Sequence, residues 1–519
     1  MNIFKLLAFV IYFIAMLAIG FIFFVKSKNE NGDKEYFLGG RSMGPWVTAM
    51  SAQASDMSGW LLMGFPGSIL AFGMGKVWIG IGLAIGTALN WIIIAKRLRR
   101  FSQAANDSIT LPQYLTNRFA TSNPALKVIC AVIFLIAFTV YVASAFNAGT
   151  IVFCSVIPWF ETRKELAMII FAAIILVYTF MGGYKAVCWT DFFQGVLMLI
   201  ALLAVPIIML SLGNFDNSYK DAFTEGVKAF NSNPFTASWQ DIASGLGWGL
   251  GYFGMPHILV RFMSIKKSSM VKKSASVAIV WVVLTLGAAV VIAYFARSFI
   301  FSDGTSLAAA LIPAGVQQNI FIKIVDNIFP GFIAGLLLSA IIAASMSTAD
   351  SQLLVASSSF TSDIYKPIIR KGKATDKETL WVGRIVVLIV SVVALLISLS
   401  GLSDNNAWAS NIMAMVENAW GLFGAAFGPV VILSLFWKRF NYAGAVSGII
   451  AGAVVDIAWL ILFTSTVTKA VIFNTGVYEI IPGFAVGMIV SIVATLLTKA
   501  PNEKVVAIYK AAIDTSIDD

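Results

Sequence analysis

Two short polar segments interrupt apolar stretches of this sequence, and both carry oxygen atoms suited to a small cation. The first, residues 54–58, reads ASDMS, and the second, residues 345–351, reads SMSTADS. Hard cations prefer carbonyl, hydroxyl and carboxylate oxygens as ligands. Because an unwound segment 54–58 would supply all three kinds, we expect a cation site where the two segments face each other.

Asp56 lies about a dozen residues into its apolar stretch, where a charge is costly. A carboxylate near the middle of a membrane helix costs roughly 2.5–3.5 kcal/mol on insertion scales, so such a residue faces a wet cavity or a partner. Asp56 could pair with a buried lysine or accept hydrogen bonds from freed backbone N–H groups. We favour the alternative that it shapes or coordinates a cation site beside a break in the helix.

Hydroxyl side chains are concentrated in the second segment. An isolated Ser or Thr in a membrane helix usually bonds the carbonyl one turn earlier or allows close helix packing. Four hydroxyls and an acid within residues 345–351 are harder to explain in this way. Ser347 and Thr348, together with the Ala344 carbonyl, would form a compact group of oxygens on one face of the helix.

Asp191 follows Trp189 and Thr190 near the start of another apolar stretch. A carboxylate at a helix N-terminus can be a favourable cap for the helix dipole. It could also provide a second ion position or a step on the ion's exit path, and the sequence leaves these alternatives open.

Three aromatic residues, Tyr141, Trp248 and Tyr252, lie well inside apolar stretches. Most Trp and Tyr residues of membrane proteins belong to belts at the two interfaces, which these positions do not fit. Aromatic rings beside a broken helix suit a small zwitterion, because the rings pack its apolar part and freed backbone N–H groups bind its carboxylate. We therefore expect a substrate site for a small polar solute here.

The stretches that hold these residues are long enough to cross a membrane. Hydrophobic residues make up 59% of the 519 positions and charged residues only 12%, whereas a soluble domain has roughly a quarter of its residues charged. At roughly 20 apolar residues per crossing, the chain has room for about a dozen spans, and we predict about thirteen. The predicted spans are 4–25, 45–73, 77–95, 126–157, 165–183, 188–213, 238–262, 275–300, 328–360, 380–402, 408–437, 440–466 and 478–498.

The loops between these spans predict the orientation of the chain. Most of the 36 Lys and Arg residues, Arg261 among them, fall in alternate loops. Basic loops stay on the cytoplasmic side of a membrane. We therefore expect a cell-membrane protein with its N-terminus outside, its C-terminus inside, and a short cytoplasmic tail over residues 500–519.

Two of the predicted spans are poor hydrophobic helices. Span 45–73 carries Ser, Gln and Asp residues before a glycine, and span 238–262 is rich in Gly and contains a Pro. Broken helices at membrane depth occur where they line a cavity, and paired broken helices indicate an inverted-repeat transporter. We predict an all-α fold with one transmembrane domain over residues 1–499, repeats at about 45–213 and 238–437, and peripheral first, twelfth and thirteenth spans.

Composition also argues against other classes of protein. The net charge of +10 comes from loop residues, so it indicates the inner face of a membrane protein and no nucleic-acid partner. We find no nucleophile–base or metal constellation of an enzyme, no organic cofactor motif and no sign of an obligate protein partner. A channel would need a repeated filter motif and a sensor a signalling domain, so both are weaker alternatives.

Several motifs then resemble the sodium/solute symporter family along essentially the whole chain, with the stretches around Asp56 and Trp248 closest to its proline branch. The matching motifs are Ser51-Ala-Gln-Ala-Ser-Asp56-Met-Ser-Gly-Trp60, Tyr36-Phe-Leu-Gly-Gly-Arg41, Tyr178-Thr-Phe-Met-Gly-Gly183, Trp189-Thr-Asp191, Gly247-Trp-Gly-Leu-Gly-Tyr252-Phe-Gly-Met-Pro-His257, Met346-Ser-Thr348, Gly424-Ala-Ala-Phe-Gly-Pro429 and Tyr478-Glu-Ile-Ile-Pro-Gly483.

The resemblance implies a leucine-transporter-type fold with 5+5 inverted repeats, alternating access and Na⁺ as the coupling ion. It places the sodium ligands on backbone carbonyls and hydroxyls, those of Ala54, Met57, Ala344, Ser347 and Thr348. It also implies a second sodium position or an exit path at Asp191, Asp350 and Ser351.

The resemblance further implies which residues bind the substrate, expected to be L-proline. Asp56, Ser58 and Gly59 match residues needed for ion and substrate binding, and Trp60 matches a gating position. Proline-site positions fall on Tyr141, Trp248, Tyr252 and Pro256. The chain departs from the family at Met255, where proline carriers have Gln, and at Asp350, where a hydroxyl is more usual; another small carboxylate or amino acid, such as pantothenate, is the alternative substrate.

Overall fold

The computed structural model describes residues 2–27, 33–181, 183–217, 231–403, 406–464 and 472–514. The regular elements in these ranges are helices, in agreement with the predicted all-α fold. Large apolar side chains such as Ile14, Leu396 and Val454 are more than half exposed. Such faces are unfavourable in water and are expected of helices that contact lipid.

Within the described ranges, ten helical segments are long and apolar enough to cross a membrane. They comprise α1 (Ile3–Ser27), α5 (Val77–Leu89) continued by α6 (Lys96–Ala104), α8 (Ala125–Val156), α10 (Tyr184–Leu212), α13 (Val271–Ala296), α16 (Gly331–Ser358) continued by η11 (Ser359–Ile369), α17 (Asp376–Ser400), α19 (Ile412–Phe436), α20 (Tyr442–Phe463) and α21 (Ile480–Leu497).

The other three predicted spans also correspond to helices. One is α9 (Lys164–Met181). The other two are the expected poor helices, and both are broken. The first consists of α3 (Pro45–Asp56), η2 (Trp60–Gly64) and α4 (Phe65–Phe72). The second consists of α11 (Trp239–Gly247), η8 (Trp248–Phe253) and α12 (Pro256–Ser264).

The first break begins directly after Asp56. Met57 has φ −87° and ψ 78°, which is outside the helical region, so the regular pattern of α3 stops there. Gly59 lies in the break against α8 and α16. A Cβ atom at Gly59 would be 2.6 Å from the Ala148 Cβ and 3.2 Å from the Ser345 Oγ, so a glycine is required for this close approach.

The second break lies between Gly254 and Pro256. Met255 is extended (φ −76°, ψ 107°), and Pro256 begins α12, where its missing N–H breaks no helical hydrogen bond. Besides weakening the helix, the glycines before the break allow close helix packing, which could not be predicted from the sequence. Cβ atoms at Gly251 and Gly254 would clash with Trp420 and with the Phe423 carbonyl, so these glycines let η8 pack directly against α19.

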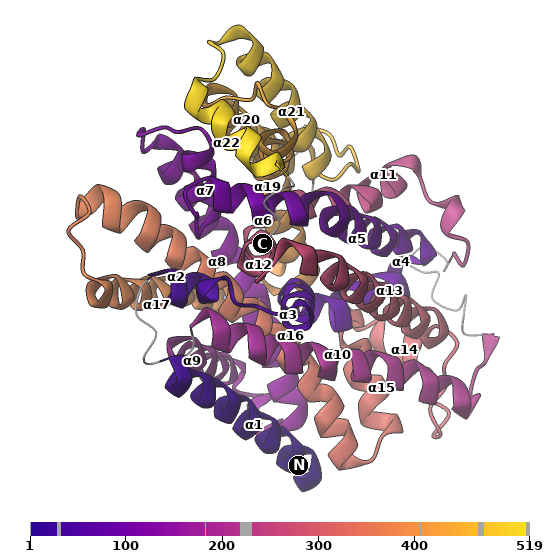
Figure 1. Ribbon diagram of the computed structural model, residues 1–519. Coiled ribbons are helices and arrows are strands. Elements are labelled where there is room, and N and C mark those ends of the chain that lie inside the picture. Colours follow the sequence, from indigo (N-terminus) through magenta and orange to yellow (C-terminus); the bar gives the residue numbers. More distant parts are fainter. Residues whose placement is uncertain are drawn as a thin grey trace.

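The long helix α16 lies at the centre of the bundle and contacts α1, α3, α8, α10 and α17 (Figure 1). Helices α19, α20 and α21 pack on one another, and α20 and α21 lie at the opposite end of the molecule from α1 (Figure 1). Within the expected tail, Glu503–Ile513 forms helix α22, which packs on α6. Tyr509 donates a hydrogen bond to the Phe436 carbonyl at 3.1 Å, which fastens α22 to the end of α19.

The shorter described elements connect these helices. They are α2 (Asp33–Leu38), η1 (Gly39–Arg41), η3 (Met74–Lys76), η4 (Asn90–Ala95), α7 (Leu111–Arg118), η5 (Pro158–Phe160), η7 (Pro234–Thr236), η9 (Ser268–Met270), α14 (Leu307–Leu311), η10 (Gln317–Asn319), α15 (Ile320–Ile328) and α18 (Ala407–Ser410).

Candidate functional site

Asp56 joins the two broken helices. It is buried, and its Oδ2 accepts a hydrogen bond from the Tyr252 hydroxyl at 2.5 Å. Its main-chain carbonyl accepts hydrogen bonds from the Tyr141 hydroxyl at 3.2 Å and from the Trp60 indole N–H at 3.4 Å. The partner of the Asp56 carboxylate is thus a tyrosine of the second break, and the alternatives of a lysine partner or freed N–H groups are wrong. Its Oδ1 has no hydrogen-bond partner within the described residues.

Aromatic rings surround this carboxylate. The Trp248 ring centroid lies 6.2 Å from that of Trp60 and 5.4 Å from that of Tyr478. Trp420 donates its indole N–H to the Trp248 carbonyl at 2.8 Å, and its ring lies 5.0 Å from that of Tyr252. All five rings are buried. The expected aromatic wall is therefore present, and two further rings complete it.

Trp420 and Tyr478 belong to the site although they were not predicted from the sequence. Trp420 lies well inside its predicted span, so the criterion that selected Trp248 would also have selected it. Tyr478 lies at the start of a predicted span and gave no such signal. Its hydroxyl donates to the Glu417 carbonyl at 2.6 Å, which fixes the ring against Trp248.

Three other expected substrate residues lie in the backbone of the two breaks. The Ser58 N–H donates to the Asp56 carbonyl at 3.1 Å, and Gly59 follows it in the tight contact with α8. Pro256 is buried at the first turn of α12. These residues shape the breaks, while the side-chain contacts described above come from Asp56 and Tyr252.

The two polar segments meet as expected. The Ser347 hydroxyl of α16 donates to the Ala54 carbonyl of α3 at 2.8 Å and lies 3.2 Å from the Ala344 carbonyl. Thr348 is buried, and its Oγ1 has no hydrogen-bond partner among the described residues. Met57 is the residue at which α3 stops being helical.

A packing function would give Thr348 the usual bond to a carbonyl one turn earlier. Ser345 makes such a bond, to the Ile341 carbonyl at 2.9 Å, whereas Thr348 makes none within the described chain. A buried hydroxyl without a partner is costly unless a ligand compensates for it. Thr348, Ser347 and the Ala54 and Ala344 carbonyls therefore form an oxygen cluster that could hold a monovalent cation.

Asp191 lies inside a helix and forms an ion pair. Helix α10 begins at Tyr184, so Asp191 is about two turns into it and the capping interpretation is wrong. Its Oδ2 is 3.1 Å from Nη2 of Arg261 and accepts a hydrogen bond from the Ser51 hydroxyl at 2.7 Å. Arg261 belongs to α12 and is buried, so it is not one of the basic loop residues with which it was counted.

Ser351 and Asp350 lie next to this pair on α16. The Ser351 Oγ accepts a hydrogen bond from Arg261 at 2.5 Å and donates to Asp191 at 3.4 Å. Asp350 is buried, and neither of its carboxylate oxygens has a hydrogen-bond partner within the described residues. Asp191 and Ser351 are thus brought together by Arg261, and Asp350 is the neighbour of Ser351 along α16.

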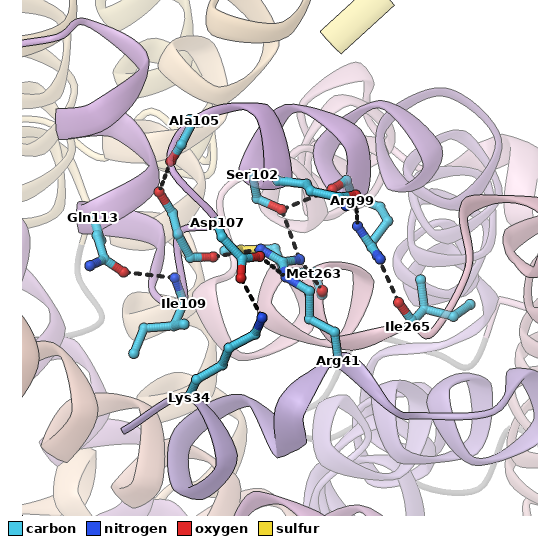
Figure 2. A network of polar contacts seen from close by, with 12 residues as sticks. Lys34, Arg41, Arg99, Ser102, Ala105, Asp107, Ile109, Gln113, Met263 and Ile265 are labelled. Carbon is cyan, nitrogen blue, oxygen red and sulfur yellow. Dashed lines mark hydrogen bonds and ion pairs between the residues drawn. The ribbon is translucent and has the colours of Figure 1, made fainter. Parts of the chain in front are cut away.

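One end of the bundle is closed by a polar network around Arg41, shown in Figure 2. Arg41 pairs with Asp107 at 2.7 Å and donates to the Ser102 hydroxyl at 3.1 Å, the Ser108 carbonyl at 2.8 Å and the Met263 carbonyl. It thereby links η1 to α6, to the following loop and to the end of α12. We call the end with Arg41 and Asp107 the inner face, after the orientation predicted from the basic loops.

Charge and burial act in opposite directions on Asp107, which lies in the loop after α6. Partial burial raises its pKa, but the hydrogen bond from Lys34 and the charge of Arg41 outweigh this and lower the pKa below its usual value. Arg99 adds a hydrogen bond to the Ile265 carbonyl at 2.7 Å (Figure 2). The network therefore holds an ionised carboxylate at ordinary pH.

The opposite end of the broken helix α3–α4 is open. A cavity of about 410 Å³ is lined by residues that include Gly64, Met413 and Glu417, and a second of about 500 Å³ lies beside it. Gly64 is one turn beyond Trp60 in η2, and both Trp60 and Asp56 are buried. We call this end the outer face. The aromatic cluster thus lies beneath an outer cavity and above a closed inner network.

These features define a class of protein: a multi-pass helical membrane protein with two broken helices around a buried polar and aromatic site. The model of the sodium:solute symporter family matches residues 36–452, and the chain belongs to this family. It is 42% identical over 504 residues to a sodium/proline symporter of Escherichia coli (strain K12), covering 96% of this chain and 94% of that protein. It is also 42% identical over 499 residues to a sodium/proline symporter of Staphylococcus aureus (strain NCTC 8325 / PS 47), covering 95% and 92%.

Two solved structures share the fold. One is a Na⁺-coupled sialic acid symporter in a substrate-bound outward-open state, with a TM-score of 0.72 at 20% identity and coverage of 96% of this chain and 98% of that chain. The other is a nucleobase-cation-symport-1 family transporter in a closed conformation, with a TM-score of 0.55 at 14% identity and coverage of 92% and 98%. The leucine-transporter-type fold expected from the sequence is therefore confirmed.

Proposed function

We propose that this chain carries L-proline into the cell together with Na⁺, by alternating access to a site between its two broken helices. The observation that carries the proposal is that one short segment joins both clusters. The Ala54 carbonyl accepts a hydrogen bond from Ser347, and two residues later the Asp56 carboxylate accepts one from Tyr252. A change in backbone conformation at this break would therefore move the ion ligands and the solute site together.

The aromatic cluster suits a small cyclic amino acid. The rings of Trp60, Trp248 and Tyr252 would pack against an apolar ring of the solute, with Tyr141 holding the Asp56 carbonyl in place. The Asp56 carboxylate would balance the positive charge on the solute nitrogen. Ser58, Gly59 and Pro256 would shape the two breaks so that free backbone N–H groups beside them can receive the solute carboxylate.

The oxygen cluster would bind the transported Na⁺. Its ligands would be the carbonyls of Ala54, Met57 and Ala344 and the hydroxyls of Ser347 and Thr348. Ser347 donates its proton to a carbonyl of the same cluster, so a cation between them replaces that hydrogen bond with two oxygen ligands. Binding of Na⁺ would hold α16 against the break in α3.

Asp191 belongs to the ion's exit path in this proposal. Arg261 already balances its charge at 3.1 Å, which disfavours a second cation at Asp191, Asp350 and Ser351. One Na⁺ per solute molecule is therefore expected. The residues would instead guide the ion when Arg261 moves away from Asp191 as α12 shifts.

The proposed function also requires a location and an orientation of the chain in the membrane. We place the protein in the cell membrane with its N-terminus outside, so that the outer face meets the medium and the inner face the cytoplasm. Repeats of about 45–213 and 238–437 would move against each other, and residues 500–519 would lie in the cytoplasm. The bilayer is its surrounding partner, with no nucleic acid and no obligate protein partner.

Uptake by the purified protein in proteoliposomes tests this proposal. Labelled proline should accumulate under an inward Na⁺ gradient, and unlabelled proline should compete more strongly than other amino acids, pantothenate or sugars. Separate Na⁺, Li⁺ and H⁺ gradients identify the coupling ion. Uptake that persists after the Na⁺ gradient is collapsed, with a proton gradient held, would contradict the coupling, and stronger competition by pantothenate would contradict the substrate.

A further inference from the structure

One face of α16 and η11 carries buried polar side chains that lack partners within the described chain. The face runs from Thr348 through Gln352 and Ser359 to Asp363, all of them buried. The Thr348 hydroxyl, both amide atoms of Gln352, the Ser359 hydroxyl and Oδ1 of Asp363 have no hydrogen-bond partner among the described residues. Spacings of four, seven and four residues put these side chains on one side of a helix.

Neighbouring hydroxyls on the other sides of the same helix are satisfied. Ser357 donates to the Gly383 carbonyl of α17 at 2.9 Å, Ser358 to the Val355 carbonyl at 2.9 Å, and Thr361 to the Ser357 carbonyl at 2.6 Å. Hydroxyls on the other sides of this helix thus find partners, although the buried Asp350 carboxylate on the opposite side also lacks one among the described residues.

The face extends from the oxygen cluster to the inner end of the bundle. Thr348 belongs to the oxygen cluster described above. At the other end, Oδ2 of Asp363 accepts a hydrogen bond from the Thr110 hydroxyl at 2.7 Å, and Thr110 caps α7 by accepting the Gln113 N–H at 3.1 Å. Gln113 is part of the polar network in Figure 2, so the face reaches the inner end of the bundle.

We propose that Na⁺ leaves the protein along this face, passing the Asp191–Arg261 pair that contacts α16 at Ser351, and that Asp363 is a cation-binding station at its inner end. The inference rests on the proposed function and adds a site to it. Buried polar atoms cost free energy when they are unpaired, so a row of them persists where water or an ion pairs with them during the transport cycle.

The chemistry at Asp363 suits a monovalent cation. The carboxylate has one oxygen held by Thr110 and one directed at no protein donor, and the buried hydroxyls of Ser359 and Ser362 nearby on η11 also lack partners within the described residues. The positive charge of Lys127 on α8 acts on the same carboxylate, so it would weaken the attraction between Asp363 and a bound cation and allow the cation to leave.

Val355 is the apolar residue between Gln352 and Ser359 on this face, and it would form the narrowest part of the route.

Cysteine labelling provides the first test, with a control one residue away. In a variant with Cys130, Cys154 and Cys188 replaced by Ser, Ser359→Cys should react with a small cationic thiol reagent applied from the inner face, and Na⁺ should slow the reaction. Ser358→Cys should stay unreactive, because Ser358 is also buried but its hydroxyl is bonded to the Val355 carbonyl. Equal reactivity of the two cysteines, or labelling of Ser359→Cys that Na⁺ does not change, would overturn the proposal.

Sodium on the two sides of the membrane provides the second test. In vesicles of known orientation, Asp363→Asn should leave activation of uptake by external Na⁺ unchanged. It should raise the internal Na⁺ concentration that halves uptake by about tenfold, since a contact to a charged group is lost. Asp303→Asn, at an exposed outer loop, is the control. An unchanged internal Na⁺ dependence, or an equal shift on both sides, would refute the station.

The two proposals fail in different ways. If the unmodified chain takes up proline without any need for Na⁺, the proposed function is wrong. If uptake depends on Na⁺ but Ser359→Cys behaves like Ser358→Cys, the function stands and the exit route is wrong. Ser359→Ala and Ser358→Ala serve as a second pair if Asp363→Asn does not fold, and only Ser359→Ala should change the internal Na⁺ dependence.

Discussion

At the scale of single residues, Asp56 and the aromatic side chains around it hold one another in place through hydrogen bonds. Asp56 is bonded to Tyr252, and its carbonyl to Tyr141 and Trp60. Removing any of these partners therefore leaves a buried polar atom, which is costly inside a membrane. If the proposed function is correct, transport and local stability depend on the same few contacts.

Trp248→Ala should weaken proline binding by roughly 5- to 150-fold, because the lost aromatic contact is worth roughly 1–3 kcal/mol. Apparent Na⁺ affinity at saturating proline should change much less, since the Trp248 ring packs on the rings of Trp60, Trp420 and Tyr478. Trp91→Ala is the control, because Trp91 is equally buried but packs on Phe262 away from Asp56. Equal losses in the two variants, measured by equilibrium proline binding, would show that Trp248 is only a packing residue.

Thr348→Ala should raise the Na⁺ concentration needed for proline binding, because it removes one ligand oxygen and leaves its space unfilled. High Na⁺ should restore proline binding to this variant but not to Trp248→Ala. Ser339→Ala removes a buried hydroxyl of the same helix that is bonded to the Gly335 carbonyl, and it should leave the Na⁺ dependence unchanged. An unshifted Na⁺ titration for Thr348→Ala would mean that the hydroxyl only packs the helix.

At the scale of elements, the two broken helices could be predicted from the sequence because their causes are local. The polar residues before Gly59 and the glycines before Pro256 lie next to the breaks in the sequence and predict them directly. The pairing of Asp191 with Arg261 could not be predicted, since the two residues are 70 positions apart and carry no local sign of contact. Trp420 lies well inside its predicted span and could have been selected by the criterion used for Trp248. Its contacts with Trp248 and Tyr252 could not be predicted, because they depend on how closely the glycines of η8 let α19 approach.

Gly59→Ala tests how tightly the first break must fit. Its Cβ atom would be 2.6 Å from that of Ala148, so α3 and α8 must separate, and we expect uptake to fall to a small fraction of the parent's. Gly287→Ala is the matched control, since a Cβ there meets nothing within 4 Å. Comparable uptake by both variants, at equal amounts of protein in the membrane, would contradict this account of the break.

At the scale of the whole molecule, an outer cavity and a closed inner network describe one stage of a transport cycle. The inner network joins η1, α6 and the end of α12, which are the elements that must separate for the site to reach the inner face. The pKa of Asp107 is lowered, so the contribution of this pair is present above the usual carboxyl pKa and is lost as pH falls through the lowered value. Between about pH 5 and 8 the network should therefore not change.

Asp107→Asn should favour opening at the inner face. Cys188 is buried in α10 beside Tyr184 and serves as a natural reporter, because Tyr184 bonds Ser264 at the end of α12. We expect Cys188 to react faster with a thiol reagent added from the inner face in this variant than in the parent. Labelling that stays as slow as in the parent would show that Arg41 holds the inner face closed without Asp107.

The central claim is that one break in α3 couples the ion to the solute, and a single titration tests it most directly. Proline binding to the purified parent protein is measured across a series of Na⁺ concentrations, with choline holding the ionic strength constant. Linkage requires that Na⁺ tighten proline binding and that proline tighten Na⁺ binding by the same factor. We predict both effects, with equal factors. A proline dissociation constant that does not change with Na⁺ would contradict the coupling on which the account rests.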